Sequence, residues 1–185
     1  MTFSQLDPAA ALIVIDMQKG VVALPTVHPI GGIIDNVAKL TQAFRDRGLP
    51  VILVNVTGRA PGRVEATFNF NPPPDWADLI PELNQQLSDY TVTKLNIGAF
   101  YGTALDQILR RRSVTQVFIA GVATGSGVEA TARQAYDRGY NVVLVTDAMT
   151  DLDAEMHRHA VEKVFPKIGE RTATAEALEQ LKSSL

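Results

Sequence analysis

The sequence predicts an α/β fold: a single three-layer α/β/α domain, doubly wound around a mainly parallel six-stranded sheet of the Rossmann-like type. Short apolar runs without charges, such as residues 117–120, have the composition of parallel strands buried on both faces. Segments with apolar side chains at helical spacing alternate with these runs, which is typical of a parallel sheet covered on both faces. No repeat, low-complexity tract or linker interrupts the pattern, so residues 1–185 are expected to form one domain.

The first part of the chain sets up this alternation. Residues 10–16 are expected as a buried strand that ends on a carboxylate, and residues 17–29 as a loop. Residues 31–47 have an apolar face at helical spacing, and a glycine and a proline follow, where a helix ends. Residues 51–56 are the second apolar strand. Residues 57–75 are rich in Gly, Pro and Asn, and a connection of this length is usually functional or disordered.

The middle of the chain continues the alternation up to a glycine-rich turn. Residues 76–87 are expected as a short helix, and residues 90–95 as an alternating strand. Residues 102–112 are expected as a crossover helix with Thr103 as its N-cap, because a threonine side chain can accept a free N–H of the first turn. Residues 117–133 begin as an apolar strand, pass through a turn of small residues and continue as an Ala-rich helix.

The last part repeats the pattern twice. Residues 141–146 are expected as the fifth strand, which closes on Asp147, and residues 153–164 as a helix. Residues 172–175 are expected as a short sixth strand and residues 175–181 as the closing helix. Ligands of open α/β sheets bind at the carboxyl ends of the strands, so the side chains that follow the strands are candidates for function.

Composition indicates an ordinary soluble globular protein, with 46% hydrophobic residues and a net charge of −3. The run Arg110-Arg111-Arg112 suits the end of a helix, so nucleic acid is not an expected partner. No apolar run is long enough to span a membrane, so a cytoplasmic protein without membrane contact is expected. The chain contains no cysteine, which excludes disulfides, thiolate zinc sites and a cysteine nucleophile.

Asp16, Asp147 and Lys94 lie at expected strand ends, and each has two interpretations. A carboxylate there either caps nearby backbone amides or acts as a general acid or base in a cleft. The lysine is either an edge residue with its ammonium in solvent or a partner that holds Asp16 ionised. Position favours function for Asp16, because strand order usually reverses beside the first strand.

The glycine-rich turn at residues 121–127 presents backbone N–H groups at the start of a helix. It matches neither the dinucleotide fingerprint nor the phosphate-binding loop, so no cofactor is expected. Ser126 lacks the G-x-S-x-G frame of a serine nucleophile. The three histidines, at positions 28, 157 and 159, lack the spacing of metal ligands, so they are expected as solvated surface residues and no metal is expected.

Three segments occur in a distinctive order and spacing: IVIDMQ at residues 13–18, Lys94 with GAFYGTAL at 98–105, and GVAT at 121–124 with VEATARQA at 128–135. Together, over residues 11–148, they resemble the isochorismatase-like hydrolase superfamily. Its members include isochorismatases, nicotinamidases and N-carbamoylsarcosine amidases. The resemblance implies a hydrolase, and it implies a homodimer or homotetramer.

The resemblance also implies roles for individual residues. Asp16 matches the catalytic aspartate of the family, Lys94 its catalytic lysine, and the bond from Val122 to Ala123 a cis peptide. In the amidases this turn orients backbone amides as an oxyanion hole. Gly127 stands where the amidases carry their nucleophilic cysteine and completes the expected catalytic set. The expected substrate-binding residues are Gln18, Arg59, Phe100, Val122, Ala123, Thr124 and Ser126.

Two departures from the amidases decide the chemistry. Gly127 rules out a thioester route, and the metal-binding Asp-x-His after the second strand is missing. True isochorismatases also keep the aspartate and lysine without the thiol. Their type reaction converts isochorismate to 2,3-dihydro-2,3-dihydroxybenzoate and pyruvate. The sequence therefore favours acid-catalysed hydrolysis of an ether or enol ether in a small anionic substrate, with Asp16 as the acid. Arg59, Arg63 and Gln18 are candidates to hold the carboxylate of the substrate, with Arg59 favoured because it follows the second strand directly. A surface salt bridge is the alternative for each arginine.

Three alternatives stay open. The chain is a catalytically degenerate homologue that binds a ligand or serves as a scaffold, or it is a small-amide hydrolase with Ser126 as a substitute nucleophile. The third alternative is an engineered change of cysteine to glycine at position 127. Asp16→Asn separates the first alternative from a hydrolase, a covalent adduct on Ser126 supports the second, and the native gene sequence tests the third.

Overall fold

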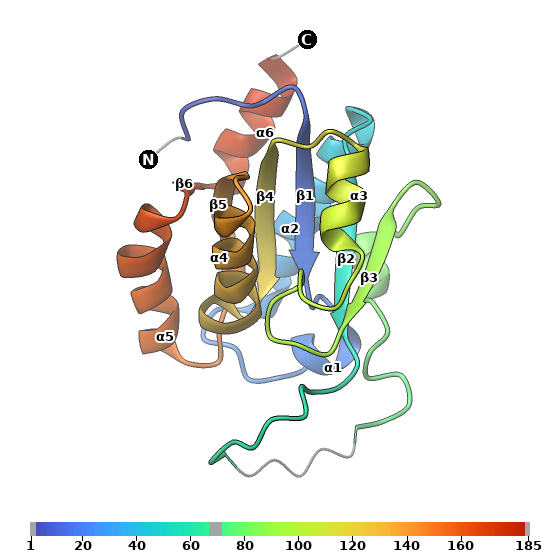
Figure 1. Ribbon diagram of the computed structural model, residues 1–185, viewed down its shortest axis with the longest axis vertical. Coiled ribbons are helices and arrows are strands. Elements are labelled where there is room, and N and C mark those ends of the chain that lie inside the picture. The colour runs from blue at the N-terminus through green and yellow to red at the C-terminus, as the bar shows by residue number, and fades with distance from the viewer. Residues whose placement is uncertain (1–2, 67–71, 184–185) are drawn as a thin grey trace.

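The structure is a computed structural model that describes residues 3–66 and 72–183 (Figure 1). Six strands form one sheet in the order β3-β2-β1-β4-β5-β6, and every neighbouring pair is parallel. The strands are β1 (Ala10–Ile15), β2 (Val51–Val56), β3 (Tyr90–Lys94), β4 (Gln116–Val122), β5 (Asn141–Thr150) and β6 (Glu170–Thr172). The predicted α/β fold with a six-stranded parallel sheet is confirmed.

The strand order reverses beside β1. From β1 the chain runs outward through β2 and β3, returns to the centre for β4, and continues through β5 and β6 on the other side. In such sheets a crevice forms outside the carboxyl ends of the strands where the order reverses. The ends of β1 and β4 therefore lie where a ligand is expected.

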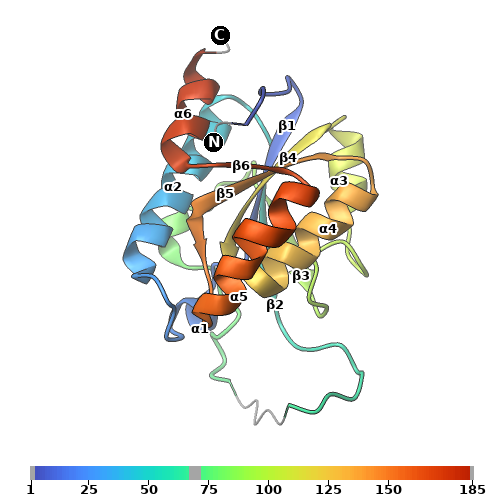
Figure 2. The same cartoon turned by 90° about the vertical axis from the view of Figure 1, so that its left-hand side faces the viewer.

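Helices cover both faces of the sheet, which Figure 2 shows from the side. One face carries α2 and α6, and the other carries α3, α4 and α5, while the short α1 lies at the carboxyl edge. The helices are α1 (Lys19–Val22), α2 (Ile30–Asp46), α3 (Leu105–Arg111), α4 (Glu129–Asp137), α5 (Ala154–His159) and α6 (Thr174–Ser183). No helix within the described residues is long and apolar enough to cross a membrane.

The apolar pattern explains the two cores between these layers. Successive residues of a strand point to opposite faces, so Leu12 of β1 faces the α2 side and Ile13 faces the α3 and α4 side. Helix α2 contributes side chains at helical spacing, which form one buried stripe. These are Ile33, Val37, Leu40, Thr41 and Phe44.

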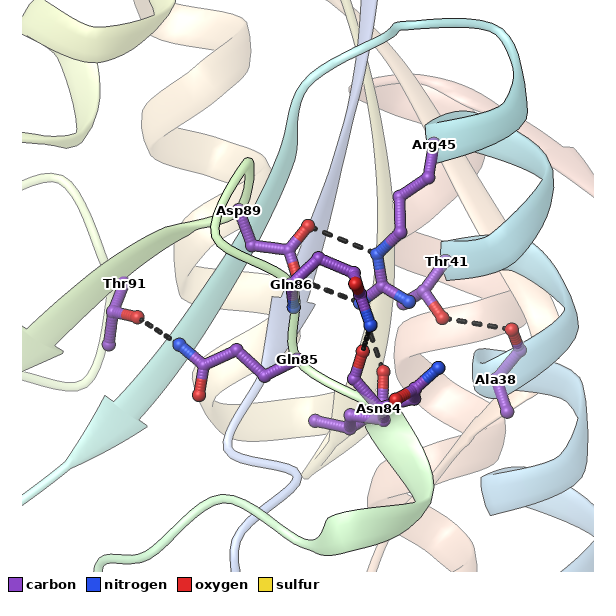
Figure 3. A network of polar contacts seen from close by, with 9 residues as sticks. Ala38, Thr41, Arg45, Asn84, Gln85, Gln86, Asp89 and Thr91 are labelled. Carbon is purple, nitrogen blue, oxygen red and sulfur yellow. Dashed lines mark hydrogen bonds and ion pairs between the residues drawn. The ribbon is translucent and has the colours of Figure 1, made fainter.

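A buried ion pair fixes α2 to the segment before β3 (Figure 3). Arg45 donates from Nε to Asp89 Oδ1 at 3.0 Å and from Nη2 to Asp89 Oδ2 at 2.8 Å. The same Nη2 donates to the carbonyl oxygen of Leu83 at 2.9 Å, and the N–H of Gln86 donates to Asp89. Both charged side chains are buried, at 8% and 1% exposure. Bidentate geometry makes this contact specific for arginine.

Two of the expected elements differ in the segment before β4. The expected helix at residues 76–87 is wrong, because the structure has only the 3₁₀ turn Pro81–Leu83 there. Proline disfavours helical geometry in the residue before it, and Ile80 is extended, with φ −69° and ψ 143°. Helix α3 begins later than expected, after Ala104, although Thr103 Oγ1 still accepts the N–H of Leu105 at 3.2 Å.

Three further boundaries differ near the end of the chain. Strand β5 continues to Thr150, past the expected end at residue 146, and pairs with β4 beyond a register shift. The expected helix at 153–164 is α5 followed by a π-type turn, Ala160–Val164. The expected strand at 172–175 is wrong after Thr172, because Thr174 starts α6. Asp147 accepts the N–H and O–H of Thr174 and so satisfies that helix start.

Candidate active site

Asp16 and Lys94 meet at the carboxyl edge of the sheet. Asp16 follows β1, Lys94 ends β3, and β2 lies between these strands. Lys94 Nζ lies 2.8 Å from Asp16 Oδ2, and the two side chains are only 3% and 8% exposed. The carboxyl ends of parallel strands share one edge, so the sheet brings together two residues that are distant in the sequence.

The environment of Asp16 suits a carboxyl group that gains and loses a proton. Oδ2 contacts Lys94, but no hydrogen-bond partner lies against the buried Oδ1 among the described residues. Burial raises the pKa of Asp16 by more than the charge and hydrogen bond of Lys94 lower it, so the pKa lies at about 6 instead of 3.8. The main chain holds the side chain in place, since Asp16 has a φ of 50° and donates its N–H to Val54.

The turn after β4 forms the other wall of the site. The bond between Val122 and Ala123 is cis, as the family resemblance implies. Gly121, with a φ of 119°, has no room for a side chain, because a Cβ would lie 2.0 Å from the carbonyl oxygen of Ile15. A Cβ on Gly127 would lie 3.0 Å from Ile15 Cγ2 and 3.4 Å from Asp16 Oδ2. Gly127 therefore lies directly against the buried carboxyl.

Much of this turn is already hydrogen-bonded within the protein. The N–H of Gly125 donates to Asp151 Oδ2 at 2.6 Å. The N–H groups of Ser126 and Val128 both donate to the carbonyl oxygen of Ala123 at 3.1 Å. The N–H groups of Gly125, Ser126 and Val128 are thus engaged within the protein and are not available to an oxyanion hole.

A cavity of about 360 Å³ opens above Asp16, Lys94 and Gly127. Of the expected substrate-binding residues, Arg59, Val122, Ala123 and Ser126 line it. Most of its remaining wall is apolar and comes from loops and strand ends. These apolar residues are Val21, Leu24, Val56, Val64, Leu95, Ile97 and Leu152. The sequence patterns gave no signal for this wall, because its members are scattered single residues that only the fold assembles.

Three expected substrate-binding residues lie outside the lining of this cavity. Gln18 is fully buried and bonds the main chain of Val56 in both directions, so it joins the segment after β1 to β2. Phe100 is buried beneath the guanidinium of Arg138. Thr124 is buried and turns its hydroxyl to His157. Each side chain is used in packing or in hydrogen bonds inside the protein.

Two of the three histidines, His28 and His159, are exposed as expected, and His157 departs from the expectation. His157 is half-buried, and its ring lies edge-on to that of His28, with 4.6 Å between the centroids. His157 Nδ1 lies 2.9 Å from Thr124 Oγ1, and His28 Nδ1 lies 3.0 Å from Thr150 Oγ1. No group of three or more metal-ligating side chains occurs in the part of the chain that the structure describes.

Comparisons with known proteins identify the family of this chain. Residues 10–176 match the sequence profile of the isochorismatase domain. The chain is 39% identical to the uncharacterized isochorismatase family protein YwoC of Bacillus subtilis (strain 168), with 93% of this chain and 94% of that protein covered. It is 30% identical to the ureidoacrylate amidohydrolase RutB of Methylobacterium radiotolerans, with 86% and 74% covered.

A solved structure gives the same result. An isochorismatase family protein from Burkholderia thailandensis superposes with a TM-score of 0.88 at 38% identity, with 98% of this chain and 100% of that chain covered. The profile match spans most of the chain, the alignment with YwoC covers more than nine tenths of both chains, and the solved structure shares the fold. On this evidence, the chain belongs to the isochorismatase family, a family of hydrolases.

Proposed function

We propose that this protein is a hydrolase that acts without a cysteine nucleophile. It would cleave an ether or enol-ether bond in a small anionic molecule by acid catalysis, with the conversion of isochorismate as the type reaction. The observation that carries the proposal is the buried carboxyl of Asp16, a residue that lines the cavity, with Oδ2 on Lys94 and a buried Oδ1 that has no hydrogen-bond partner among the described residues. Gly127, at the position of the amidase nucleophile, leaves that floor without a thiol.

The proposed reaction needs an acid and water. Protonated Asp16 gives its proton to the vinylic carbon of the enol ether, which forms an oxocarbenium ion. Water adds to the cation and loses a proton, and the resulting hemiketal breaks its C–O bond to release a ketone and an alcohol. The proton lost by water restores Asp16. The ammonium of Lys94 stabilises the carboxylate that exists between these steps.

The cavity also suits a small anionic substrate. Arg59 is exposed and lines the cavity, which supports a role in pairing with a substrate carboxylate. Arg63, the second candidate from the sequence, is not among the residues that line the cavity. The apolar side chains of the wall would contact the uncharged part of the substrate.

The direct test is release of pyruvate from isochorismate by the purified protein. Wild type is expected to release pyruvate, and Asp16→Asn is expected to lose this activity because an amide cannot donate the proton. Asp137→Asn, an exposed aspartate at the end of α4, is the matched control and should retain activity. If wild type releases no pyruvate, isochorismate is not the substrate. The broader proposal then requires turnover of another enol ether that Asp16→Asn abolishes.

Amide hydrolysis is the second candidate, because an amidohydrolase is among the relatives and Ser126 lines the cavity. Incubation with an activated amide or ester, followed by mass spectrometry, would detect an acylated Ser126. A Ser126→Ala variant should lose the adduct if the serine is the nucleophile. Turnover that survives Asp16→Asn but needs Ser126 would favour this candidate over acid catalysis. Binding without any turnover would favour a ligand-binding homologue.

A further inference from the structure

The turn formed by residues 123–127 contacts both the substrate cavity and His157. Ala123, Ser126 and Gly127 line the substrate cavity, and Thr124 contacts His157. His157 and His28 line a second cavity of about 690 Å³ between α2, the end of β5 and α5. The position of the 123–127 turn sets the shape of the substrate cavity, so groups that hold it from the far side affect that cavity without touching a substrate.

The side chain of Asp151 holds this turn by a hydrogen bond to the main chain of Gly125. Oδ2 accepts the N–H of Gly125 at 2.6 Å, and Oδ1 accepts the N–H groups of Leu152 and Asp153 at 2.7 and 3.3 Å. The side chain is buried, at 3% exposure, and no cation forms an ion pair with it among the residues that the structure describes. A buried carboxylate held by backbone donors alone fixes the distance between those donors.

His157 holds the same turn through a side chain. Its Nδ1 lies 2.9 Å from the hydroxyl of Thr124, which is completely buried. Gly125 lies directly against α5, since a Cβ there would lie 3.2 Å from Met156 Cβ and 3.3 Å from Asp151 Oδ2. The turn therefore has two polar attachments and a close backbone approach on its far side.

We propose that Asp151 and His157 are positioning residues that hold the 123–127 turn in place from the far side of the substrate cavity. The hydrogen bond to Thr124 makes that position depend on the protonation of the imidazole of His157. The consequence for turnover rests on the proposed function, but the positioning itself does not.

The charge on the imidazole decides what this hydrogen bond can be. Neutral His157 can accept the hydroxyl hydrogen of Thr124 at Nδ1, whereas an imidazolium can only donate there. Burial, followed by the charge of His28, lowers the pKa of His157, and the charge of Asp151 raises it. The other charged groups lining the second cavity are Asp35 and Lys39 from α2 and Asp147 from β5. The neutral imidazole, which unlike the imidazolium can accept the hydroxyl hydrogen of Thr124 at Nδ1, is therefore favoured at neutral pH.

A substrate-free NMR titration tests the role of His157. The amide resonance of Gly125 is followed from about pH 5 to pH 8, the range in which histidines titrate. An Asp16→Asn background removes the other titrating group of the cavity. We expect a transition below the ordinary histidine pKa of about 6.5. His157→Asn, which keeps a polar group near Nδ1 but does not titrate, should abolish it.

Two variants complete this titration. His159→Asn, two residues along α5, is the matched control and should retain the transition. His28→Asn should also retain it but move it to higher pH, because one neighbouring positive charge is removed. A transition that persists in His157→Asn, or no transition in the parent protein, overturns the proposed protonation dependence.

Hydrogen exchange at the Gly125 amide tests the role of Asp151. Asp151→Asn should speed that exchange by about tenfold or more, because the acceptor of this N–H is weakened. Asp137→Asn should leave the rate unchanged. Equal rates in Asp151→Asn and wild type would show that the carboxylate does not hold the turn.

A kinetic measurement links this role to turnover. His157→Phe keeps a ring but loses the hydrogen bond, so kcat should fall about tenfold while KM changes less than about twofold. An unchanged kcat overturns a positioning role in catalysis. If wild type turns over no substrate, the proposed function fails, while the NMR and exchange measurements still decide whether the two residues hold the turn.

Discussion

At the scale of single residues, the carboxyl of Asp16 is subject to two opposing effects. Burial favours its neutral form, and Lys94 at 2.8 Å favours its charged form. Burial has the larger effect, so the pKa is raised to about 6. An acid with this pKa is partly protonated near neutral pH and is still acidic enough to give up its proton.

This pKa predicts the pH dependence of turnover. If protonated Asp16 is the acid, kcat/KM should be constant below about pH 6 and fall tenfold per pH unit above it. Lys94→Met removes the charge that lowers this pKa, so the descending limb should move to higher pH. Steady-state assays across this range measure both effects. A rate that instead rises with pH would indicate that the carboxylate is a base, which contradicts the proposed role.

Gly127 illustrates a second effect at this scale. A methyl group at this position would lie 3.0 Å from Ile15 Cγ2, closer than an ordinary contact. We expect Gly127→Ala to lower the free energy of unfolding by about 1–3 kcal/mol through overpacking. Denaturant unfolding of Gly127→Ala, Ile15→Ala and the double variant measures this. The double variant should be more stable than the sum of the two single changes predicts, because Ile15→Ala removes the clashing methyl.

The control for this cycle is Ile15→Val, which shortens the side chain but keeps the methyl that faces Gly127. Its effect should simply add to that of Gly127→Ala. Coupling of equal size with Val and with Ala at position 15 would show that the contact with Cγ2 is not the cause. Gly127→Cys should meet the same contact with Ile15, because the Cβ of a cysteine occupies the same space as the methyl group of an alanine.

At the scale of elements, local signals predicted the regular parts and missed those that depend on tertiary contacts. Strands β1 and β2 are nearly continuous apolar runs and helix α2 has apolar residues at helical spacing, so the sequence located all three to within a residue or two. The helix expected at 76–87 failed because Pro81 makes Ile80 extended. The extension of β5 to Thr150 depends on pairing with β4 beyond a register shift, which no local pattern contains.

In the candidate site, too, some residues had a local signal in the sequence and others depend on tertiary contacts. Asp16 and Lys94 were found because each is a charge at the end of an otherwise uncharged strand. Gln18 and Thr124 were expected at the substrate, but the structure uses both inside the protein. The interaction of His157 with the turn had no signal in the sequence, because its partner Thr124 is 33 positions away. Contacts of that range follow only from the packing of α5 against the turn.

The ion pair between Arg45 of α2 and Asp89 gives a prediction for elements. Arg45→Ala leaves a carboxylate that is 1% exposed without its partner, so the free energy of unfolding should fall by about 3–5 kcal/mol. Arg133 pairs with Glu129 on the surface of α4, and its side chain is 53% exposed. Arg133→Ala is the matched control and should cost about 1 kcal/mol or less. Urea unfolding compares them, and equal losses would contradict the argument from burial.

At the scale of the whole molecule, the sheet brings the site residues together, and burying one of them affects the stability of the fold. The strand order places the ends of β1, β3 and β4 around one cavity, although they are far apart in the sequence. A carboxyl buried there is less easily ionised than in the unfolded chain. The whole fold therefore loses stability when Asp16 is ionised.

The protonation of Asp16 and the free energy of unfolding are linked, and the direction of the pKa change fixes how stability depends on pH. The folded pKa of Asp16, about 6, lies above the ordinary value of 3.8, so the folded state binds the proton more tightly. The resulting stabilisation is fully present below the ordinary pKa and is lost as the pH rises through the folded pKa. The free energy of unfolding of wild type minus that of Asp16→Asn should therefore fall between about pH 4 and pH 6, by up to about 3 kcal/mol. Denaturant unfolding of both proteins at several pH values measures the difference, and groups such as His157 that titrate in both proteins cancel. A difference that stays constant or rises with pH would show that Lys94, and not burial, has the larger effect on the pKa of Asp16. Asp16 would then be ionised throughout the working range and could not serve as the acid.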